Sequence, residues 1–216
     1  MNAIRKEKLK DGVLASLKDA ILGGELKPGD RIVEIKVASD MGVSQGTVRE
    51  ALKELEHFGL IENRSYKGTY VKRFTKKDVS DAYDARLILE LFAVERAAET
   101  ISPERLDFLH ELMEKMNDAA KKGDVNSFVD YDVRFHEAIV STCGNEMIVK
   151  LWHLANVSLW TLVATNLGKR SLKNLAARHT DIYSTLQSHD PLAVKEAMRI
   201  HLLELRDEMV EKAEEV

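Results

Sequence analysis

One turn followed by one amphipathic helix constrains the fold of this chain more than any other feature of its sequence. Gly42 permits a sharp turn, and apolar residues then recur at helical spacing. These apolar residues are Val48, Ala51, Leu52, Leu55 and Phe58. The rest of the circumference is polar, with Gln45, Arg49, Lys53 and Glu56. One stripe is therefore predicted to pack inward while the other side faces solvent, as in the second helix of a helix-turn-helix, whose exposed side can enter the major groove of DNA.

Elements on both sides of this helix complete a small domain. Residues 7–22 and 34–41 predict two earlier helices from the spacing of their apolar side chains. Residues 60–62 and 69–72 are β-prone runs around a turn with a basic tip, which predicts a hairpin. Three helices and a short β-hairpin make a winged helix-turn-helix, which is predicted to occupy residues 1–74.

From residue 75 onward the sequence shows no further strand pattern. Thr75, Ser102 and Asp190 are suited to begin helices, because their side-chain oxygens can accept hydrogen bonds from free backbone N–H groups. Such signals divide this part into about six predicted helices, at residues 76–100, 103–122, 124–142, 145–167, 171–189 and 191–214. Residues 75–216 are therefore predicted to form one all-α helical bundle, and the fold as a whole is dominated by helices.

The composition excludes several classes of protein. Of the 216 residues, 44% are hydrophobic and 31% are charged. The sequence contains no run of about 18 apolar residues and starts with a polar segment. We therefore expect a cytoplasmic protein that is not exported and does not span a membrane. The lone Cys143 excludes an internal disulfide, and we expect it to be buried near a helix end.

The two predicted domains differ in charge. Residues 1–74 carry 14 Lys and Arg against 11 Asp and Glu, whereas residues 75–216 carry 18 against 25. A basic segment that coincides with the helix-turn-helix pattern favours DNA as its partner. The acidic remainder is expected to have a different role.

Four residues of the predicted bundle form a candidate metal site. Asp132 and His136 are four residues apart and share one helical face, while His179 and His201 lie on two later helices with apolar neighbours. Three imidazoles and a carboxylate suit a borderline transition ion such as zinc, nickel, cobalt or manganese, and leave positions for water or a ligand. Structural or surface roles are expected for the other histidines of the bundle, His110, His153 and His189.

Several short motifs, taken together, resemble the GntR family of bacterial transcription regulators. They are Glu25-Leu26-Lys27-Pro28-Gly29, Gly42-Val43-Ser44, Thr47-Val48-Arg49-Glu50-Ala51-Leu52, Leu55, Gly59-Leu60 and Gly68-Thr69-Tyr70-Val71. The all-helical remainder resembles the effector domain of the FadR-like branch in its metal-containing form, the FCD type. This resemblance implies one metal ion per chain, zinc or nickel foremost, held by the Asp and three His named above.

The resemblance also implies that the first domain binds double-stranded operator DNA through its third helix and its wing. The implied contacts are Ser44, Gln45, Thr47, Arg49, Lys67 and Gly68. The chain departs from the family pattern at Gln45, where Arg is usual, and at Gly46, where Thr or Pro is frequent. Arg favours guanine and Gln favours adenine, so the departure at Gln45 leaves open which bases of the operator this chain prefers.

A homodimer whose helical domain binds a small carboxylate follows from the same resemblance. Arg86 is the predicted partner of that carboxylate, whose other oxygens would reach the metal, and Asn156 is a further candidate for the pocket. Taken alone, Arg86 and Glu90 also fit a simple ion pair along one helix. The predicted function is therefore a ligand-responsive repressor and not an enzyme.

Two alternatives stay open from the residues alone. A site of His and carboxylate ligands with open positions could activate water, which would make the helical domain a metal-dependent enzyme. Against this, no H-E-x-x-H motif occurs, and Glu137 points roughly 100° around the helix from His136. The same three His and one Asp would suit either a permanently bound metal ion or one whose binding is the signal, so the metal itself could be what the protein senses.

Overall fold

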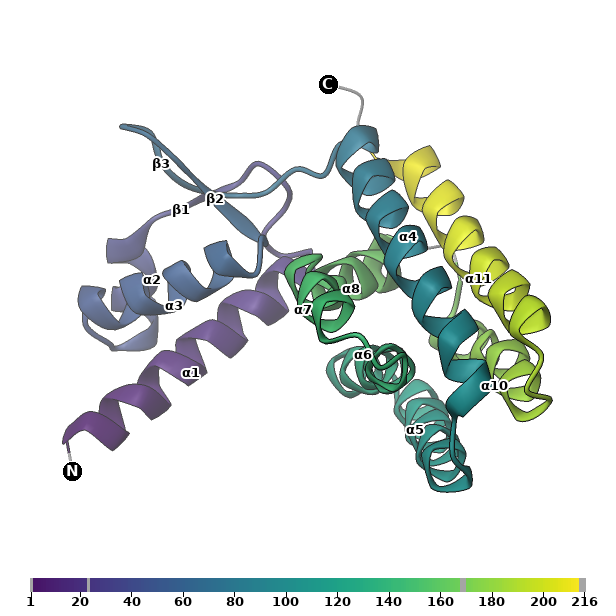
Figure 1. Ribbon diagram of the computed structural model, residues 1–216. Coiled ribbons are helices and arrows are strands. Elements are labelled where there is room, and N and C mark those ends of the chain that lie inside the picture. The colour runs from purple at the N-terminus through teal and green to yellow at the C-terminus, as the bar shows by residue number, and fades with distance from the viewer. Residues whose placement is uncertain (1, 23, 168–169, 214–216) are drawn as a thin grey trace. The chain divides into compact units, whose positions relative to one another are not determined.

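The chain divides into two compact units, Met1–Phe74 and Thr75–Val216. The computed structural model describes residues 2–22, 24–167 and 170–213. In the first unit, three helices accompany a small antiparallel sheet, while the second is built from helices (Figure 1). Within the described residues no single helix is long and apolar enough to cross a membrane. The helical segments Glu146–Leu154 and Val157–Thr165 together have the length and composition of such a span, but they are bent by 47° at the break between them.

Within residues 2–22 and 24–74, the first unit contains three helices and three strands. They are α1 (Asn2–Leu22), β1 (Arg31–Ile32), α2 (Glu34–Met41), α3 (Gln45–His57), β2 (Ile61–Arg64) and β3 (Gly68–Val71). The predicted hairpin is β2 and β3, and β1 adds a third strand, with Ile32 opposite Thr69. The strand order is β1-β3-β2. The sequence did not reveal β1, because two residues are too few for an alternating pattern.

Helix α3 is fixed at its start and along its buried stripe. The Ser44 hydroxyl accepts a hydrogen bond from the Thr47 backbone N–H at 3.1 Å, and Gly42 turns the chain before it with φ 65°. The predicted stripe is buried from Val48 to Leu55 and packs against α1 and α2. Phe58 was expected in this stripe but is 42% exposed, because α3 ends at His57.

The second unit consists of eight helices within its described part. They are α4 (Lys76–Thr100), α5 (Pro103–Lys122), α6 (Val125–Thr142), α7 (Glu146–Leu154), α8 (Val157–Leu167), α9 (Leu172–Ala177), α10 (His179–Gln187) and α11 (Pro191–Lys212). The long helices α4 and α11 run side by side, and α5 packs on α6 (Figure 1). Thr75, Ser102 and Asp190 cap α4, α5 and α11, as predicted.

Two of the predicted helices are each divided. Residues 145–167 form α7 and α8, separated at Asn156, whose φ of 51° lies in the left-handed region. Residues 171–189 form α9 and α10, separated at Arg178. Neither break contains Gly or Pro, so the sequence carries no signal for it. The predicted end of the last helix, residue 214, lies outside the described residues.

Candidate functional site

Three histidines from three different helices meet inside the second unit. His136 lies on α6, His179 begins α10, and His201 lies on α11, and all three are buried. One ring nitrogen of each lies within 4.8 Å of the corresponding nitrogens of the other two. The tertiary fold therefore brings together the three imidazoles that the sequence singled out.

Hydrogen bonds orient two of these rings. His136 Nδ1 lies 2.7 Å from Glu90 Oε2, and His179 Nδ1 lies 3.2 Å from the Ala176 carbonyl oxygen. With Nδ1 as the donor in both rings, each Nε2 carries a lone pair. Both Nε2 atoms are buried, and neither makes a hydrogen bond within the described part of the chain. Such rings are prepared as metal ligands, since an engaged Nδ1 fixes the tautomer and the ring orientation.

Asp132 completes the cluster from α6, one helical turn before His136. Its Oδ1 lies 3.1 Å from His179 Nε2, but the geometry of this contact is not that of a hydrogen bond. Its Oδ2 accepts a hydrogen bond from Thr161 Oγ1 at 3.1 Å. Two ligand atoms, each about 2.1 Å from one ion and at right angles, lie about 3 Å apart. The spacing of Oδ1 and Nε2 therefore fits a shared ion.

Electrostatics favour the ligand forms of these groups. Burial raises the pKa of Asp132, but the neighbouring His179, His136 and Arg86 together outweigh burial and hold this pKa well below its usual range. Burial, together with the nearby His179 and His136, lowers the pKa of His201 well below its usual value. An ionised carboxylate and a neutral imidazole are the forms that bind metal ions.

Glu90 connects this cluster to the predicted ligand-binding arginine. Arg86 Nε donates to Glu90 Oε1 at 2.7 Å, and both side chains are buried. Burial raises the pKa of Glu90, but the neighbouring Arg86 and His136, which both hydrogen-bond to its carboxylate, outweigh burial and hold this pKa at about 2. The sequence indicated the pair along α4 but missed the contact with His136, which lies 46 residues away along the chain.

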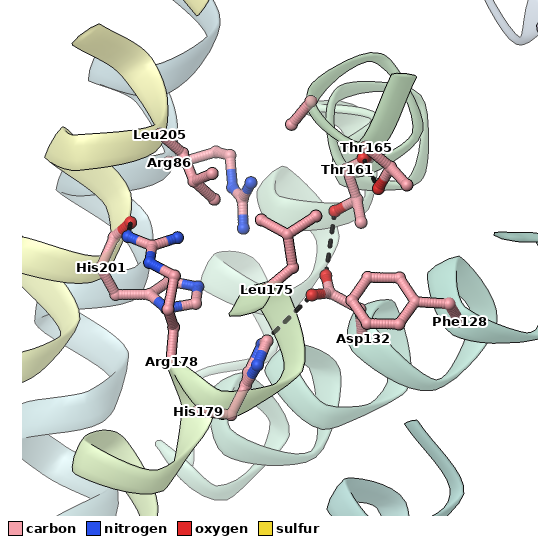
Figure 2. A pocket seen from close by; sticks show the side chains of 11 residues that line it. Arg86, Phe128, Asp132, Thr161, Thr165, Leu175, Arg178, His179, His201 and Leu205 are labelled. Carbon is pink, nitrogen blue, oxygen red and sulfur yellow. Dashed lines mark hydrogen bonds and ion pairs between the residues drawn. The ribbon is translucent and has the colours of Figure 1, made fainter. Parts of the chain in front are cut away.

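A pocket opens beside the cluster (Figure 2). Asp132, His179 and His201 line it together with Arg86. Apolar walls come from Phe128, Leu175 and Leu205, and further polar groups come from Thr161, Thr165 and Arg178. The pocket thus combines candidate metal ligands, cationic groups and apolar surface.

Other residues considered in the sequence lie outside this pocket. Asn156 sits at the break between α7 and α8 and is not among the lining residues. Two of the remaining histidines approach surface carboxylates, His110 near Glu114 and His153 near Glu137. His189 Nδ1 lies 2.9 Å from the Ala98 carbonyl oxygen. Cys143 is buried just after α6, as expected.

The first unit presents a different kind of surface. Ser44, Gln45, Arg49 and Lys67 are exposed along the start of α3 and at the wing, where Gly68 is partly exposed. Thr47 differs from the others, because its side chain is buried and its hydroxyl pairs with Ser44 Oγ at 2.9 Å. Arg49 Nη2 lies 2.9 Å from Glu34 Oε2 on α2. Polar groups of α3 therefore stand on an accessible face.

The tip of the wing carries an aromatic residue that the sequence analysis did not single out. Tyr66 is fully exposed and adopts φ 60°, a left-handed conformation that non-glycine residues rarely take. It follows β2, where the Arg64 guanidinium stacks 4.6 Å from the centre of the Tyr70 ring. The sequence signal for this unusual conformation was a Tyr at a turn position where Gly or Asn is usual.

Comparison with known proteins identifies the two units. The family model "Bacterial regulatory proteins, gntR family" matches residues 9–71, and the FCD domain model matches residues 81–204. The chain belongs to the GntR family and carries an FCD domain. Members of this family bind operator DNA, and FCD domains bind small-molecule effectors.

Individual relatives support this assignment. The chain is 28% identical over 206 residues to the "Probable D-xylose utilization operon transcriptional repressor" of Paenarthrobacter nicotinovorans, covering 94% of this chain and 91% of that protein. It is 28% identical over 209 residues to the HTH-type transcriptional regulator LutR of Bacillus subtilis, covering 87% and 94%. Its fold resembles a GntR regulator from Rhodococcus sp. RHA1, with a TM-score of 0.72, 21% identity and coverage of 95% and 99%. These relatives are transcription regulators and not enzymes, so this protein is a transcription regulator.

Proposed function

We propose that this GntR regulator is a homodimeric repressor whose FCD domain binds one transition ion and a small organic acid. Binding of the acid would change the affinity for operator DNA. The observation that carries this proposal is the buried cluster of His136, His179 and His201, whose ligand nitrogens lie within 4.8 Å of one another beside Asp132. Buried imidazole nitrogens without hydrogen bonds are costly unless a ligand satisfies them.

The residues of the cluster fit a zinc or nickel ion. Asp132 and the three histidines would hold it, with Glu90 and Thr161 orienting His136 and Asp132 from behind. When bound, such an ion supplies a Lewis-acid contact for an oxygen of the organic acid. Cobalt and manganese suit the same donor set.

Arg86 is the proposed partner of the ligand carboxylate. Its Nε is held by Glu90, which fixes the guanidinium where it lines the pocket. A planar guanidinium matches a carboxylate through paired hydrogen bonds. Asn156 is left out of this proposal, because it lies outside the pocket lining.

On the DNA side, the exposed start of α3 and the wing would contact the operator. Ser44, Gln45 and Arg49 would reach the major groove, and Lys67 with the Gly68 backbone would contact the DNA beside it. Thr47 would instead hold the helix start through Ser44. In a twofold dimer, a ligand that favours one arrangement of the two winged helices would shift DNA affinity by about 1 to 3 kcal/mol of coupling.

Metal content is the first test. We expect elemental mass spectrometry to find about one transition ion per chain in the wild type and in His153→Ala, a control at an exposed histidine. His179→Ala should lose most of the ion. A metal-free wild type, even after incubation with zinc or nickel, would contradict the proposed site.

Operator binding is the second test. We would select a DNA site with the purified protein and measure its affinity with and without metal, and with lactate, succinate or citrate. A change caused by a carboxylate only in the metal-loaded protein supports the proposal. A change caused by metal alone would make the metal the signal, and no change with any addition would contradict regulation through this pocket.

A further inference from the structure

Arg178 is a second cationic group of the pocket, in addition to Arg86. It lies between α9 and α10, directly before His179, and it lines the pocket together with Arg86 (Figure 2). Its Nη2 donates to the His201 carbonyl oxygen at 2.6 Å. Its Nη1 is buried and has no hydrogen-bond partner among the described residues. One side of this guanidinium is therefore engaged, and the other keeps unused donors.

The charge of Arg178 is also less well compensated than that of Arg86. Arg86 has a buried carboxylate partner, Glu90, at 2.7 Å. The carboxylate nearest to Arg178 is Glu204, at 3.3 Å, and it is about half exposed. Glu204 lies closer to another cation, Arg170, at 3.0 Å. Arg170 also pairs with Glu208 at 2.6 Å, so Arg170 and Arg178 have two partly exposed carboxylates between them, whereas the Arg178 side chain is only 11% exposed.

A buried guanidinium with free N–H groups favours an anionic partner. Leaving a charged donor unpaired away from water costs more than leaving a neutral one. A carboxylate oxygen supplies both the acceptor and the opposite charge. Because Arg178 lines the pocket, we take a ligand bound there as the source of that carboxylate.

We propose that Arg178 forms a second anion subsite and that the effector is a short dicarboxylic acid. One carboxylate would bind at Arg86 and the metal, and the other would accept hydrogen bonds from Arg178. The apolar side chains of Leu175 and Leu205 would cover the short carbon chain between them. This inference rests on the proposed function, because it assumes that the pocket binds an organic acid.

Calorimetric titration of the metal-loaded, full-length protein tests the inference. Succinate and glutarate are compared with butyrate and valerate, which have the same chain lengths but only one carboxylate. We expect the diacids to bind at least about tenfold more tightly, as charged hydrogen bonds imply. Arg178→Gln should remove this preference and leave the affinity for monoacids unchanged.

Arg170→Gln is the matched control, because Arg170 contacts the same Glu204 but does not line the pocket. It should keep the preference for diacids. Metal content is measured for each variant, since Arg178 also contacts the His201 backbone. Equal weakening of diacids and monoacids in Arg178→Gln, with metal lost, would show a purely structural role and overturn the inference.

The outcomes separate the inference from the proposed function. If the wild type binds monoacids and diacids equally, the second subsite is wrong while the organic-acid pocket stands. In that case Arg86→Gln should still weaken both classes. If the metal-loaded wild type binds none of the four acids, both the second subsite and the proposed pocket are contradicted.

Discussion

An arginine and a glutamate pair in each of the two units, with opposite surroundings. In the winged helix, Arg49 and Glu34 are 2.9 Å apart, and their side chains are 59% and 29% exposed. In the FCD domain, Arg86 and Glu90 are 2.7 Å apart and are 2% and 0% exposed. Water and salt screen the first pair, whereas the second cannot lose one member without leaving a buried charge.

The two units use polar residues in different ways. On α3, the polar groups stand on the surface, where we propose that they exchange their partners for DNA. In the FCD domain, they are held by a network that runs from Arg86 through Glu90 to His136. Substitutions in the first unit should therefore change binding without changing stability, and substitutions in the second should change both.

Removing the buried carboxylate should have the largest effect. In Glu90→Gln, the charge of Arg86 loses its partner, and the free energy of unfolding should fall by about 3–5 kcal/mol. Urea unfolding followed by circular dichroism, with a chelator present, measures this without a metal contribution. The surface counterpart Glu34→Gln should stay close to wild type. Similar losses in both variants would remove the distinction between the two pairs.

A smaller effect is expected at Thr161, which contacts the proposed metal ligand Asp132 and not the ion itself. Thr161→Val removes the hydroxyl that donates to Asp132 Oδ2, and metal affinity should fall roughly 10- to 100-fold. Thr165→Val is the control, because the Thr165 hydroxyl donates to the Thr161 backbone oxygen instead. Competition with a chromophoric chelator measures both. Equal affinities for Thr161→Val and wild type would mean that Asp132 needs no orientation by α8.

On the exposed pair, binding should change while stability does not. Arg49→Ala should weaken operator binding by about tenfold, as expected for one lost DNA contact. Its thermal unfolding should match the wild type. Glu34→Gln releases Arg49 and should keep or raise operator affinity, which fluorescence anisotropy would measure. If Arg49→Ala binds the operator as tightly as wild type, α3 does not use this residue.

The smallest effect is expected at the wing. Tyr66→Gly relieves a left-handed backbone conformation and should raise the melting temperature of the winged helix by a few degrees. Ser65→Gly is the control, since Ser65 does not have a positive φ. Differential scanning calorimetry compares the two. A lower melting temperature for Tyr66→Gly would show that the Tyr66 side chain stabilises the turn.

The sequence alone predicted most of the local elements and the family. The stripe from Val48 to Leu55 follows from helical spacing, and the helix starts at Thr75 and Ser102 follow from capping chemistry. Asp132 and His136 share a face for the same reason, since four residues make about one helical turn. All these features depend on residues that are neighbours along the chain.

Only the tertiary structure decided which side chains meet across helices. The contact of Glu90 with His136 spans 46 residues, and that of Thr161 with Asp132 spans 29. The buried Nη1 of Arg178 appears only when α9, α10 and α11 are in place. Periodicity gives the face of a helix, but the packing of many side chains sets how one helix is shifted and rotated against the next. That packing, and not any local pattern, builds the pocket of this regulator.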